Sequence, residues 1–153
     1  MTDLTGGFGV DFYFVSRHFR RAQYTERNAE LCQVVEHNLK VLGADNASVV
    51  CGDAVEQLRT IDPQTLIFID PARRDAHGAR TFAISDCTPD VMELLPDLRR
   101  KARFVMIKLS PMLDWHKAIV DLNNHIASID IVATHGECKE LLLVLRRLII
   151  LQL

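Results

Sequence analysis

The stretch Asp3-Leu4-Thr5-Gly6-Gly7-Phe8-Gly9-Val10-Asp11 opens the chain with a glycine-rich loop. Glycines let a backbone turn sharply and approach a ligand closely, and a helix that follows such a loop offers free N–H groups to an anion. In open α/β folds a loop of this kind follows a buried strand. The stretch therefore predicts a strand, a loop and a helix of an α/β fold, although a tight strand–helix turn without a ligand also fits the glycines.

The residues around the loop favour one kind of ligand over another. A dinucleotide fingerprint has the form G-x-G-x-x-G, and with Gly7 and Gly9 as its first two glycines the third place is occupied by Phe12. Asp3 precedes the loop, where a carboxylate attracts a ligand ammonium and repels a pyrophosphate. We therefore expect a ligand that carries both an ammonium and a carboxylate rather than a dinucleotide.

Short apolar runs alternate with helical stretches along the rest of the chain. This alternation predicts a mostly parallel sheet with helices on both faces. The predicted strands are Ala22–Thr25, Ala47–Cys51, Thr65–Ile69, Arg103–Lys108, Ser128–Thr134 and Glu140–Leu145. The polar turn at 135–137 predicts that the last two strands form an antiparallel hairpin, which gives the sheet an antiparallel edge.

Two of the predicted helices have defined ends. Asn28–Leu42 is followed by Gly43, which is typical of the position just past a helix. The apolar residues expected on its buried face are Leu31, Val34, Val35, Leu39 and Leu42. Thr88 and Pro89 predict the N-cap and first position of a second helix that runs to about Lys101.

Composition limits the function without naming it. The 153 residues predict one domain, and the formal net charge of −2 gives no overall attraction to nucleic acid or to an anionic membrane. No apolar stretch reaches the roughly 20 residues of a membrane span, and the N-terminus lacks a signal pattern. The four cysteines form no CxxC pair and the histidines show no metal-ligand spacing, so we expect reduced thiols in a cytoplasmic protein without a metal site.

Acidic residues stand at the ends of three predicted strands. Glu26 can accept two hydrogen bonds from a ribose diol, although an acid before a helix also stabilises the helix dipole. Asp53 can accept from an adenine amino group or can cap a helix. Asp70 and Pro71 follow four apolar residues, at the strand end where open α/β sheets bind their ligands.

Basic and polar residues near these acids are candidates for substrate binding. Arg73 and Arg74 follow Asp70 closely and are suited to a phosphate or carboxylate, although a solvated arginine pair is the alternative. Lys108 and Ser110 end another predicted strand and are expected to form the floor of a substrate pocket.

Taken in order, the loop, Glu26, Asp53 and the D-P-A-R of 70–73 resemble the motifs of class I S-adenosylmethionine (SAM)-dependent methyltransferases. The resemblance covers nearly the whole chain, with Thr5 in place of the first glycine of D/E-x-G-x-G-x-G. It implies a Rossmann-like α/β fold whose seven-stranded, mostly parallel sheet has the order 3-2-1-4-5-7-6, with its last strand antiparallel. Only Met1–Leu4 is available for the first strand, which we therefore expect to be truncated.

The resemblance also implies roles for individual residues. Asp3 and the loop would hold the methionine part of SAM, Glu26 the ribose and Asp53 with Ala54 the adenine. The expected cofactor-binding residues are Asp3, Thr5, Gly6, Gly7, Gly9, Glu26, Asp53, Ala54 and Asp70. The expected catalytic residues are Asp70, Pro71 and Arg73, and the expected substrate-binding residues are Arg73, Arg74, Lys108 and Ser110.

More narrowly, the loop and the D-P-A-R-R stretch resemble a group of bacterial proteins that carry a THUMP-like RNA-binding domain beyond the methyltransferase core. We therefore expect 1–153 to be one methyltransferase domain and a fragment of a longer protein. The D-P-P-Y enzymes that methylate amino groups have an aromatic residue where this chain has Arg73, and uracil C5-methyltransferases have a nucleophilic cysteine where it has Leu109.

These departures predict direct transfer of the SAM methyl group to a nitrogen or oxygen atom of RNA, either rRNA or tRNA. The basic segments Arg17–Arg21 and Arg99–Arg103 favour RNA, whereas the net charge does not. Two alternatives remain open at this point. One is a non-catalytic SAM- or nucleotide-binding module, and the other is a small-molecule methyltransferase.

Overall fold

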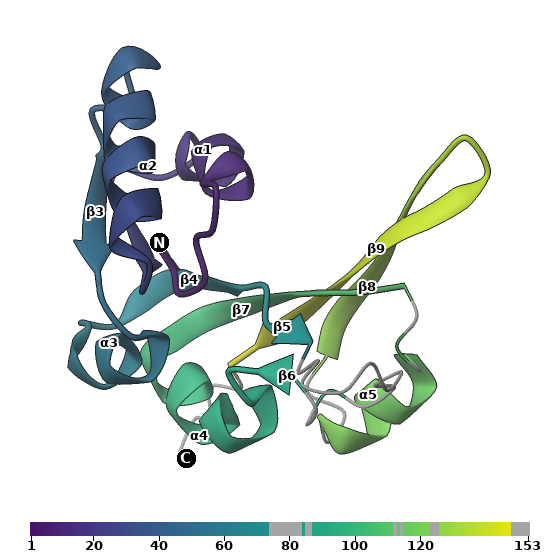
Figure 1. Cartoon of the computed structure of the whole chain (residues 1–153). Helices are drawn as coiled ribbons and strands as arrows, with labels where there is room; N and C mark the ends of the chain where they lie inside the picture. The colour runs from purple at the N-terminus through teal and green to yellow at the C-terminus, as the bar shows by residue number, and fades with distance from the viewer. Residues whose placement is uncertain (74–83, 85–86, 112, 114, 123–125, 148–153) are drawn as a thin grey trace.

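The computed structural model describes residues 1–73, 84, 87–111, 113, 115–122 and 126–147. Its main sheet has seven strands in the order β3-β2-β1-β4-β7-β9-β8 (Figure 1). They are β1 (Thr2–Asp3), β2 (Ala22–Glu26), β3 (Ala47–Cys51), β4 (Gln64–Ile69), β7 (Ala102–Leu109), β8 (Ile126–Thr134) and β9 (Glu137–Arg146). Numbered along the chain within this sheet, the order is 3-2-1-4-5-7-6, as predicted, and β1 has only 2 residues.

Most strands of the sheet are parallel, as predicted, and only β9 runs antiparallel to the others. β1 runs parallel to β2 and β4, β2 to β3, and β4 to β7. β9 is antiparallel to both β7 and β8, so the antiparallel strand lies inside the sheet and β8 forms the edge. The hairpin turns at His135 and Gly136, whose φ angles of 52° and 77° are the left-handed values that a two-residue hairpin turn requires. The hairpin extends beyond the rest of the sheet in Figure 1.

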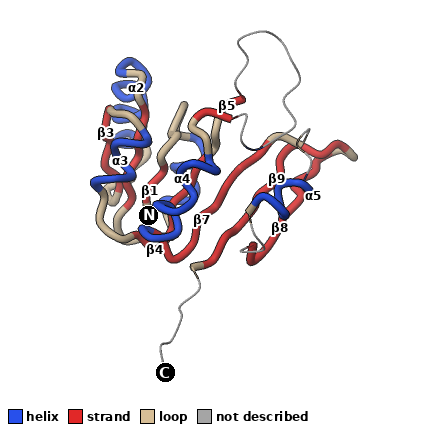
Figure 2. The backbone as a smooth tube through the Cα atoms, turned by 90° about the horizontal axis from the view of Figure 1, so that it is seen from below, coloured by secondary structure: helices blue, strands red, loops and turns tan. Residues whose placement is uncertain are grey.

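Helices cover both faces of the sheet, which confirms the predicted layers. On one face, α1 (Val10–Ser16) and α2 (Ala29–Val41) pack against one apolar cluster. On the other, α3 (Ala54–Thr60), α4 (Val91–Lys101) and α5 (Trp115–Asp121) pack against a second cluster. Figure 2 shows α5 at the β8–β9 end of the sheet, away from α2.

Strand β4 shows how one apolar run serves both clusters. Successive residues of a strand point to opposite faces of the sheet. Leu66 and Phe68 accordingly belong to the α1–α2 cluster, whereas Ile67 and Ile69 belong to the α3–α5 cluster. A strand buried on both sides needs apolar residues at every position, which is why its sequence does not alternate.

Helix α2 has the predicted ends but a different buried face. The Asn28 side chain accepts from Glu30 N at 2.9 Å and caps the helix, and Gly43 follows it with φ 67°. Its buried residues are Cys32, Val35 and Leu39. The prediction was wrong for Val34 and Leu42, which are 50% and 52% exposed. The apolar residues of this helix form a wider band than the sheet covers. A prediction from their spacing alone therefore included residues that are exposed.

Helix α4 begins two residues later than predicted. Its N-cap is Asp90, whose carboxylate accepts from Met92 N at 2.9 Å and Glu93 N at 3.3 Å. Thr88 instead belongs to β6 (Cys87–Thr88), which pairs antiparallel with β5 (Ala72–Arg73). The carboxylate of Asp90 satisfies two N–H groups at the start of the helix, which explains why the helix begins there.

Candidate functional site

Parallel strands bring the predicted site residues to one edge of the sheet. The glycine loop follows β1, Asp70 follows β4, and Lys108 lies next to the end of β7. The pairs Asp3–Phe68 and Ile69–Ile107 set these three strand ends side by side. Strand β9 runs the other way, so the residue pair Leu109–Leu141 brings the beginning of β9 to the same edge.

The glycine loop is shaped by its packing against β2 and α2. A Cβ atom on Gly6 would lie 2.0 Å from the Tyr24 ring, and one on Gly9 would lie 2.8 Å from Val35. Gly9 also has a φ of 75°, a left-handed value that favours glycine. The Tyr24 hydroxyl donates to the carbonyl of Gly7. The loop therefore rests directly on the core and has little freedom to move inward.

Asp3 supports the loop from within the protein. The residue is 1% exposed, and its Oδ1 accepts from Thr5 N at 2.9 Å. Burial raises the pKa of Asp3 to about 7, with the Thr5 N–H bond opposing the rise and repulsion from Asp11 and Asp70 adding to it. In this conformation the carboxyl group holds the first turn of the loop.

Thr5 connects the glycine loop to the end of β4. Its Oγ1 accepts from Asp70 N at 2.6 Å, and the next loop residue, Gly6, donates to the carbonyl of Thr25 at 2.9 Å. A glycine at position 5, as in the family pattern, would lack the hydroxyl that makes the first of these bonds. The departure from the pattern thus creates a direct link between the loop and Asp70.

Glu26 and Asp53 lie at the same edge, beyond β2 and β3. The Glu26 carboxylate accepts from Gly7 N at 3.1 Å and from Asn28 N at 2.9 Å, so it joins the glycine loop to the start of α2. Asp53 is exposed and caps α3, which begins at Ala54, by accepting from Val55 N at 2.8 Å. Both acids make the helix-end contacts that were the alternatives to ligand binding. Both also lie at the edge of the sheet that carries the glycine loop.

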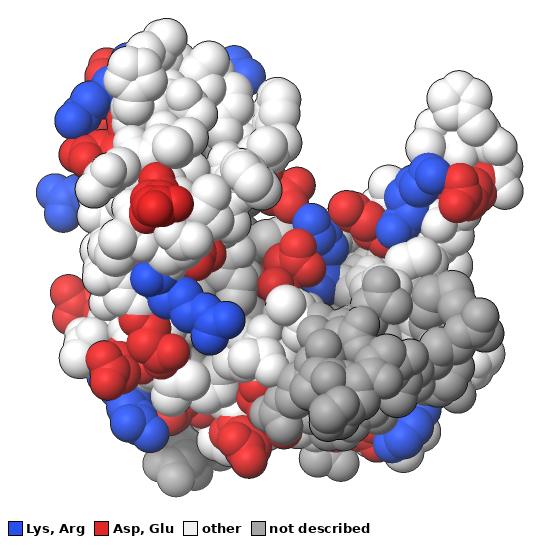
Figure 3. Space-filling model, viewed as in Figure 1, with Lys and Arg blue, Asp and Glu red and all other residues white. Residues whose placement is uncertain are grey.

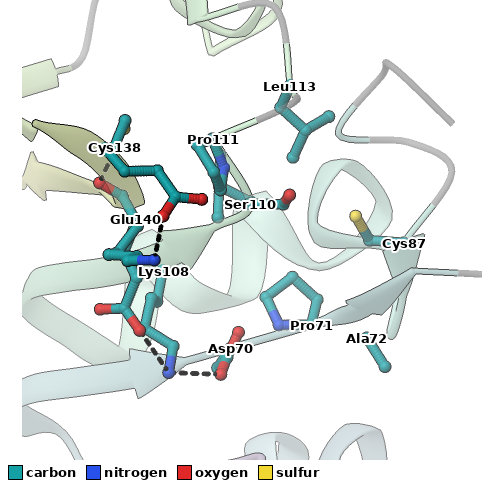
Figure 4. A pocket seen from close by; sticks show the side chains of 13 residues that line it. Asp70, Pro71, Ala72, Cys87, Lys108, Ser110, Pro111, Leu113, Cys138 and Glu140 are labelled. Atoms are coloured by element: carbon teal, nitrogen blue, oxygen red, sulfur yellow. Dashed lines mark hydrogen bonds and ion pairs between the residues drawn. The ribbon is translucent and has the colours of Figure 1, made fainter. Parts of the chain in front are cut away.

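Lys108 is surrounded by carboxylates from three elements. Its Nζ lies 2.6 Å from Asp11 Oδ2, 2.8 Å from Asp70 Oδ2 and 3.4 Å from Glu140 Oε1, and its side chain is 16% exposed. Figure 4 shows the ammonium between the carboxylates of Asp70 and Glu140. Burial lowers the pKa of Lys108, but the hydrogen bonds to Asp11 and Asp70 outweigh it and raise the pKa overall. Lys108 therefore stays charged.

The same cluster perturbs Asp70. Its side chain is 40% exposed. Burial raises the pKa of Asp70, the ion pair with Lys108 opposes the rise, and repulsion from Asp11 and Glu140 adds to it. A carboxylate with a raised pKa accepts a proton more readily, so Asp70 is suited to act as a base.

A pocket of about 540 Å³ opens beside this cluster. Asp70, Lys108 and Glu140 line one side of it, and Cys87 and Leu113 line another (Figure 4). The other lining residues are Pro71, Ala72, Leu109, Ser110, Pro111, Glu137, Cys138 and Lys139. Figure 3 shows charged side chains gathered at the floor of a hollow between the α1–α2 side and the β8–β9 hairpin.

Sequence reasoning missed two members of the cluster, Asp11 and Glu140. Asp11 lies in the first turn of α1, directly after the glycine loop, and its place in the opening stretch was a usable signal. Glu140 reaches the site only because β9 pairs with β7, and no local pattern indicates that pairing partner.

Some predicted site residues are not brought to the pocket by described contacts. Arg73 lies in β5 by its backbone, which pairs with Cys87, while its side chain and the whole of Arg74 lie outside the described residues. The basic segments lie at the opposite edge, because Arg21 directly precedes β2 and Arg103 is the second residue of β7. A second pocket, of about 1020 Å³, occupies that edge beside His18, Arg20 and Arg21.

Two kinds of feature are absent from the described part of the chain. Within it, no group of three or more His, Cys, Asp or Glu residues is arranged to hold a metal ion. Among the helices that the structure describes, none is both long enough and apolar enough to cross a membrane.

Solved structures share this fold. A candidate methyltransferase from Porphyromonas gingivalis W83 is 36% identical with a TM-score of 0.81, and the match covers 95% of this chain and 36% of that chain. An rRNA methylase from Streptococcus thermophilus is 12% identical, with a TM-score of 0.67 and coverage of 96% and 86%. TrmK of M. capricolum, in complex with S-adenosyl-homocysteine, is 11% identical, with a TM-score of 0.67 and coverage of 95% and 61%.

This chain spans 36% of the length of the P. gingivalis protein. No protein-family model and no curated protein matches the sequence. The shared architecture comprises the seven-stranded sheet with its inserted antiparallel strand and the helices on both faces. The chain therefore has the α/β fold of the class I methyltransferases.

Proposed function

We propose that this chain is the core of a SAM-dependent methyltransferase that transfers a methyl group to a nitrogen or oxygen atom of RNA. The observation that carries the proposal is the bond from Asp70 N to Thr5 Oγ1, at 2.6 Å. It places a carboxylate with a raised pKa between the glycine loop and the 540 Å³ pocket. A methyl donor on the loop and an acceptor in the pocket would then meet at Asp70.

The loop edge fits the groups of SAM. At Gly7 an added Cβ would have only the Thr5 carbonyl, 4.0 Å away, as a neighbour, so the backbone is open to a ligand there. Glu26 lies at the end of β2 with its carboxylate beside Gly7, within the edge where a ribose would lie. Asp11, Asp70 and Glu140 outnumber Lys108, so their cluster carries net negative charge and suits a sulfonium cation. When bound, SAM supplies the activated methyl group.

The residues of the chain would act mainly by positioning. Asp70 orients the acceptor atom and takes its proton, and Lys108 fixes the Asp70 carboxylate. Leu109 stands where covalent C5-methyltransferases have a cysteine, so the acceptor atom would attack the methyl group directly, without activation of the base by a thiol. Arg73 and Arg74 are proposed to contact RNA phosphate near the pocket.

RNA is the preferred substrate class for two reasons. Methylases that act on rRNA are among the solved structures with this fold. The D-P-A-R stretch is also most similar to the D-P-P-[RWYF] element of RNA-modifying enzymes. We further propose that the protein is cytoplasmic and that a separate THUMP-like domain, as in the bacterial proteins that the loop and the D-P-A-R-R stretch resemble, contributes to RNA recognition.

A transfer assay tests the proposal. The purified protein, including whatever residues its reading frame adds on either side of this chain, is incubated with methyl-labelled SAM and either total bacterial RNA or a metabolite extract, and label is expected in RNA. Arg103→Ala, at the opposite edge, serves as the control and should transfer normally. Label in small molecules alone would identify a small-molecule methyltransferase. Absence of label in both, together with SAM binding, would identify a non-catalytic module.

Thermal melts test the cofactor independently of transfer. A ligand at about 100 times its dissociation constant adds about 2.7 kcal/mol to stability. We expect SAM or S-adenosyl-homocysteine to raise the melting temperature more than NAD does. A larger shift with NAD would reverse the cofactor assignment.

A further inference from the structure

Lys108 has no donor left for a substrate. An ammonium group has three N–H donors. The three carboxylate oxygens within 3.4 Å of Nζ, from Asp11, Asp70 and Glu140, match those donors one for one. Lys108 was predicted to bind substrate, but this arrangement makes it a positioning residue that fixes two pocket carboxylates.

Asp70 and Glu140 keep capacity to accept hydrogen bonds. A carboxylate has about four lone-pair sites, and Lys108 occupies one on each of them. Their side chains are 40% and 39% exposed, and both line the same pocket. Lys139, the other lysine of the lining, pairs with Glu137 at 2.5 Å. At the Lys108 cluster, the pocket therefore offers acceptors rather than donors.

The net charge of the Lys108 cluster also favours a ligand group that donates hydrogen bonds. Asp11, Asp70 and Glu140 leave net negative charge after pairing with Lys108. A phosphate or carboxylate entering the pocket would meet repulsion there, whereas an N–H group would be attracted. Cys87 and Leu113 supply an apolar wall on another side, suited to the face of a planar ring (Figure 4).

We infer that Glu140 is a second acceptor-binding carboxylate beside Asp70, and that together they select an exocyclic amino group of a nucleobase. This inference rests on the proposed function and names its acceptor atom. An amino group has two N–H donors, one for each carboxylate. A hydroxyl has one donor and a ring carbonyl has none, so either would leave a carboxylate without a partner at a cost in affinity.

The transfer balances with this acceptor. The amino nitrogen forms the new bond to the methyl carbon while the sulfur–carbon bond of SAM breaks, and the electron pair returns to sulfur. The nitrogen then releases one proton, which Asp70 takes as the base. Glu140 keeps the second N–H in place and gains no proton.

Pairs of nucleosides with and without an amino group test the preference for that group without requiring methyl transfer. Cytidine and uridine differ by an amino group against a carbonyl, as do adenosine and inosine. Each is titrated by calorimetry into the full chain with S-adenosyl-homocysteine present. We expect the amino member of at least one pair to bind about tenfold more tightly than its partner, as one lost bond to a charged group predicts. Equal binding within both pairs, and also between guanosine and inosine, which lacks the guanine amino group, overturns the inference, as does no binding at all.

The variant Glu140→Gln tests whether Glu140 contacts the amino group or only supports the structure of the pocket. The amide keeps the shape but replaces one acceptor oxygen by a donor, so the amino preference should fall to about twofold or less. The melting temperature and the affinity for S-adenosyl-homocysteine should be unchanged. Asp130→Asn is the matched control, because Asp130 lies on the same hairpin outside the pocket lining and should leave the preference intact. A preference that survives Glu140→Gln contradicts the assigned contact.

Analysis of the labelled RNA distinguishes this inference from the proposed function. Digestion to nucleosides should place the label on an exocyclic nitrogen. Label on ribose oxygen or ring atoms alone overturns the inference and leaves RNA methylation in place. Absence of label in any RNA contradicts the proposed function, and the nucleoside pairs then still decide whether the pocket prefers an amino group.

Discussion

The two edges of the sheet differ in charge and in what gathers there. The carboxyl-terminal edge holds the glycine loop, Asp70 and the Lys108 cluster beside a pocket of about 540 Å³. The amino-terminal edge holds Arg20, Arg21 and Arg103 beside a pocket of about 1020 Å³. The larger pocket and the more basic surface are thus not where the loop and the strand-end acids meet. The proposed site is therefore assigned from the sheet topology, and not from the size of a cavity or from clustered arginines.

The first prediction compares the methyl-transfer activity of one variant at each edge of the sheet. Asp70→Asn should lower methyl transfer about a hundredfold or more, because loss of a positioned base typically costs that much. The affinity for S-adenosyl-homocysteine, which lacks the sulfonium charge, should change by about twofold or less, since the backbone N–H that donates to Thr5 is retained. Arg103→Ala should change transfer by no more than about twofold. Transfer rates and calorimetry measure both effects, and equal losses in the two variants would remove the distinction between the edges.

The second prediction concerns the cofactor. Glu26→Ala should weaken SAM binding about tenfold, because charge-assisted hydrogen bonds to the ribose are lost. Glu36→Ala removes an acid from the outer surface of α2, where it pairs with Lys40, and should leave affinity unchanged. Calorimetry on both variants makes the comparison. If the SAM affinity is the same in both variants, Glu26 only accepts the hydrogen bonds from Gly7 N and Asn28 N and does not bind the ribose.

The third prediction uses the pH dependence of transfer. Asp70 must be ionised to act as a base, so activity should fall as the pH falls through its pKa. Lys108 opposes the rise in that pKa, and Lys108→Met should therefore shift the acid limb upward by about one pH unit or more. Lys40→Met, on α2, should leave the limb in place. A shift to lower pH in Lys108→Met would contradict the assigned electrostatics.

The fourth prediction concerns stability rather than rate. The pKa of Asp3 is about 7 in the folded chain against an ordinary value of 3.8, so the folded state holds a proton that the unfolded chain has released between these values. Stability should therefore fall as the pH rises through this window, by at most about 1.4 kcal/mol per pH unit from this group. Asp3→Asn keeps an oxygen for Thr5 N and should flatten the slope. Urea unfolding of both proteins across the window measures the difference, and parallel slopes would show that Asp3 does not carry it.

The sequence predicted which strand ends share an edge of the sheet better than it predicted the contacts at that edge. Buried parallel strands are continuous apolar runs that stop at polar residues, so the end of β4 and the position of Asp70 could be inferred directly. The β8–β9 hairpin followed from the turn at His135 and Gly136. These features depend on residues that are close in the sequence.

Contacts between distant elements could not be predicted in this way. The Lys108 cluster requires α1, β4, β7 and β9 to place carboxylate oxygens within 3.4 Å of Lys108 Nζ. The implied strand order made β7 and β9 neighbours, but it did not indicate which of their side chains meet. The N-cap at Asp90 was missed because Thr88 and Pro89 offered a plausible helix start two residues earlier. The basic segments were taken to favour RNA, but a charge count does not indicate the edge of the sheet to which a segment belongs.

The bond between Thr5 and Asp70 has a thermodynamic consequence. Thr5 belongs to the loop proposed to hold SAM, and Asp70 belongs to the pocket proposed to hold the acceptor, so a displacement of one backbone is transmitted to the other. If SAM changes the affinity for the acceptor by some factor, the acceptor must change the affinity for SAM by the same factor. A serine at position 5 would keep a hydroxyl for the Asp70 N–H and so retain any such coupling through this bond, whereas a glycine would remove the bond.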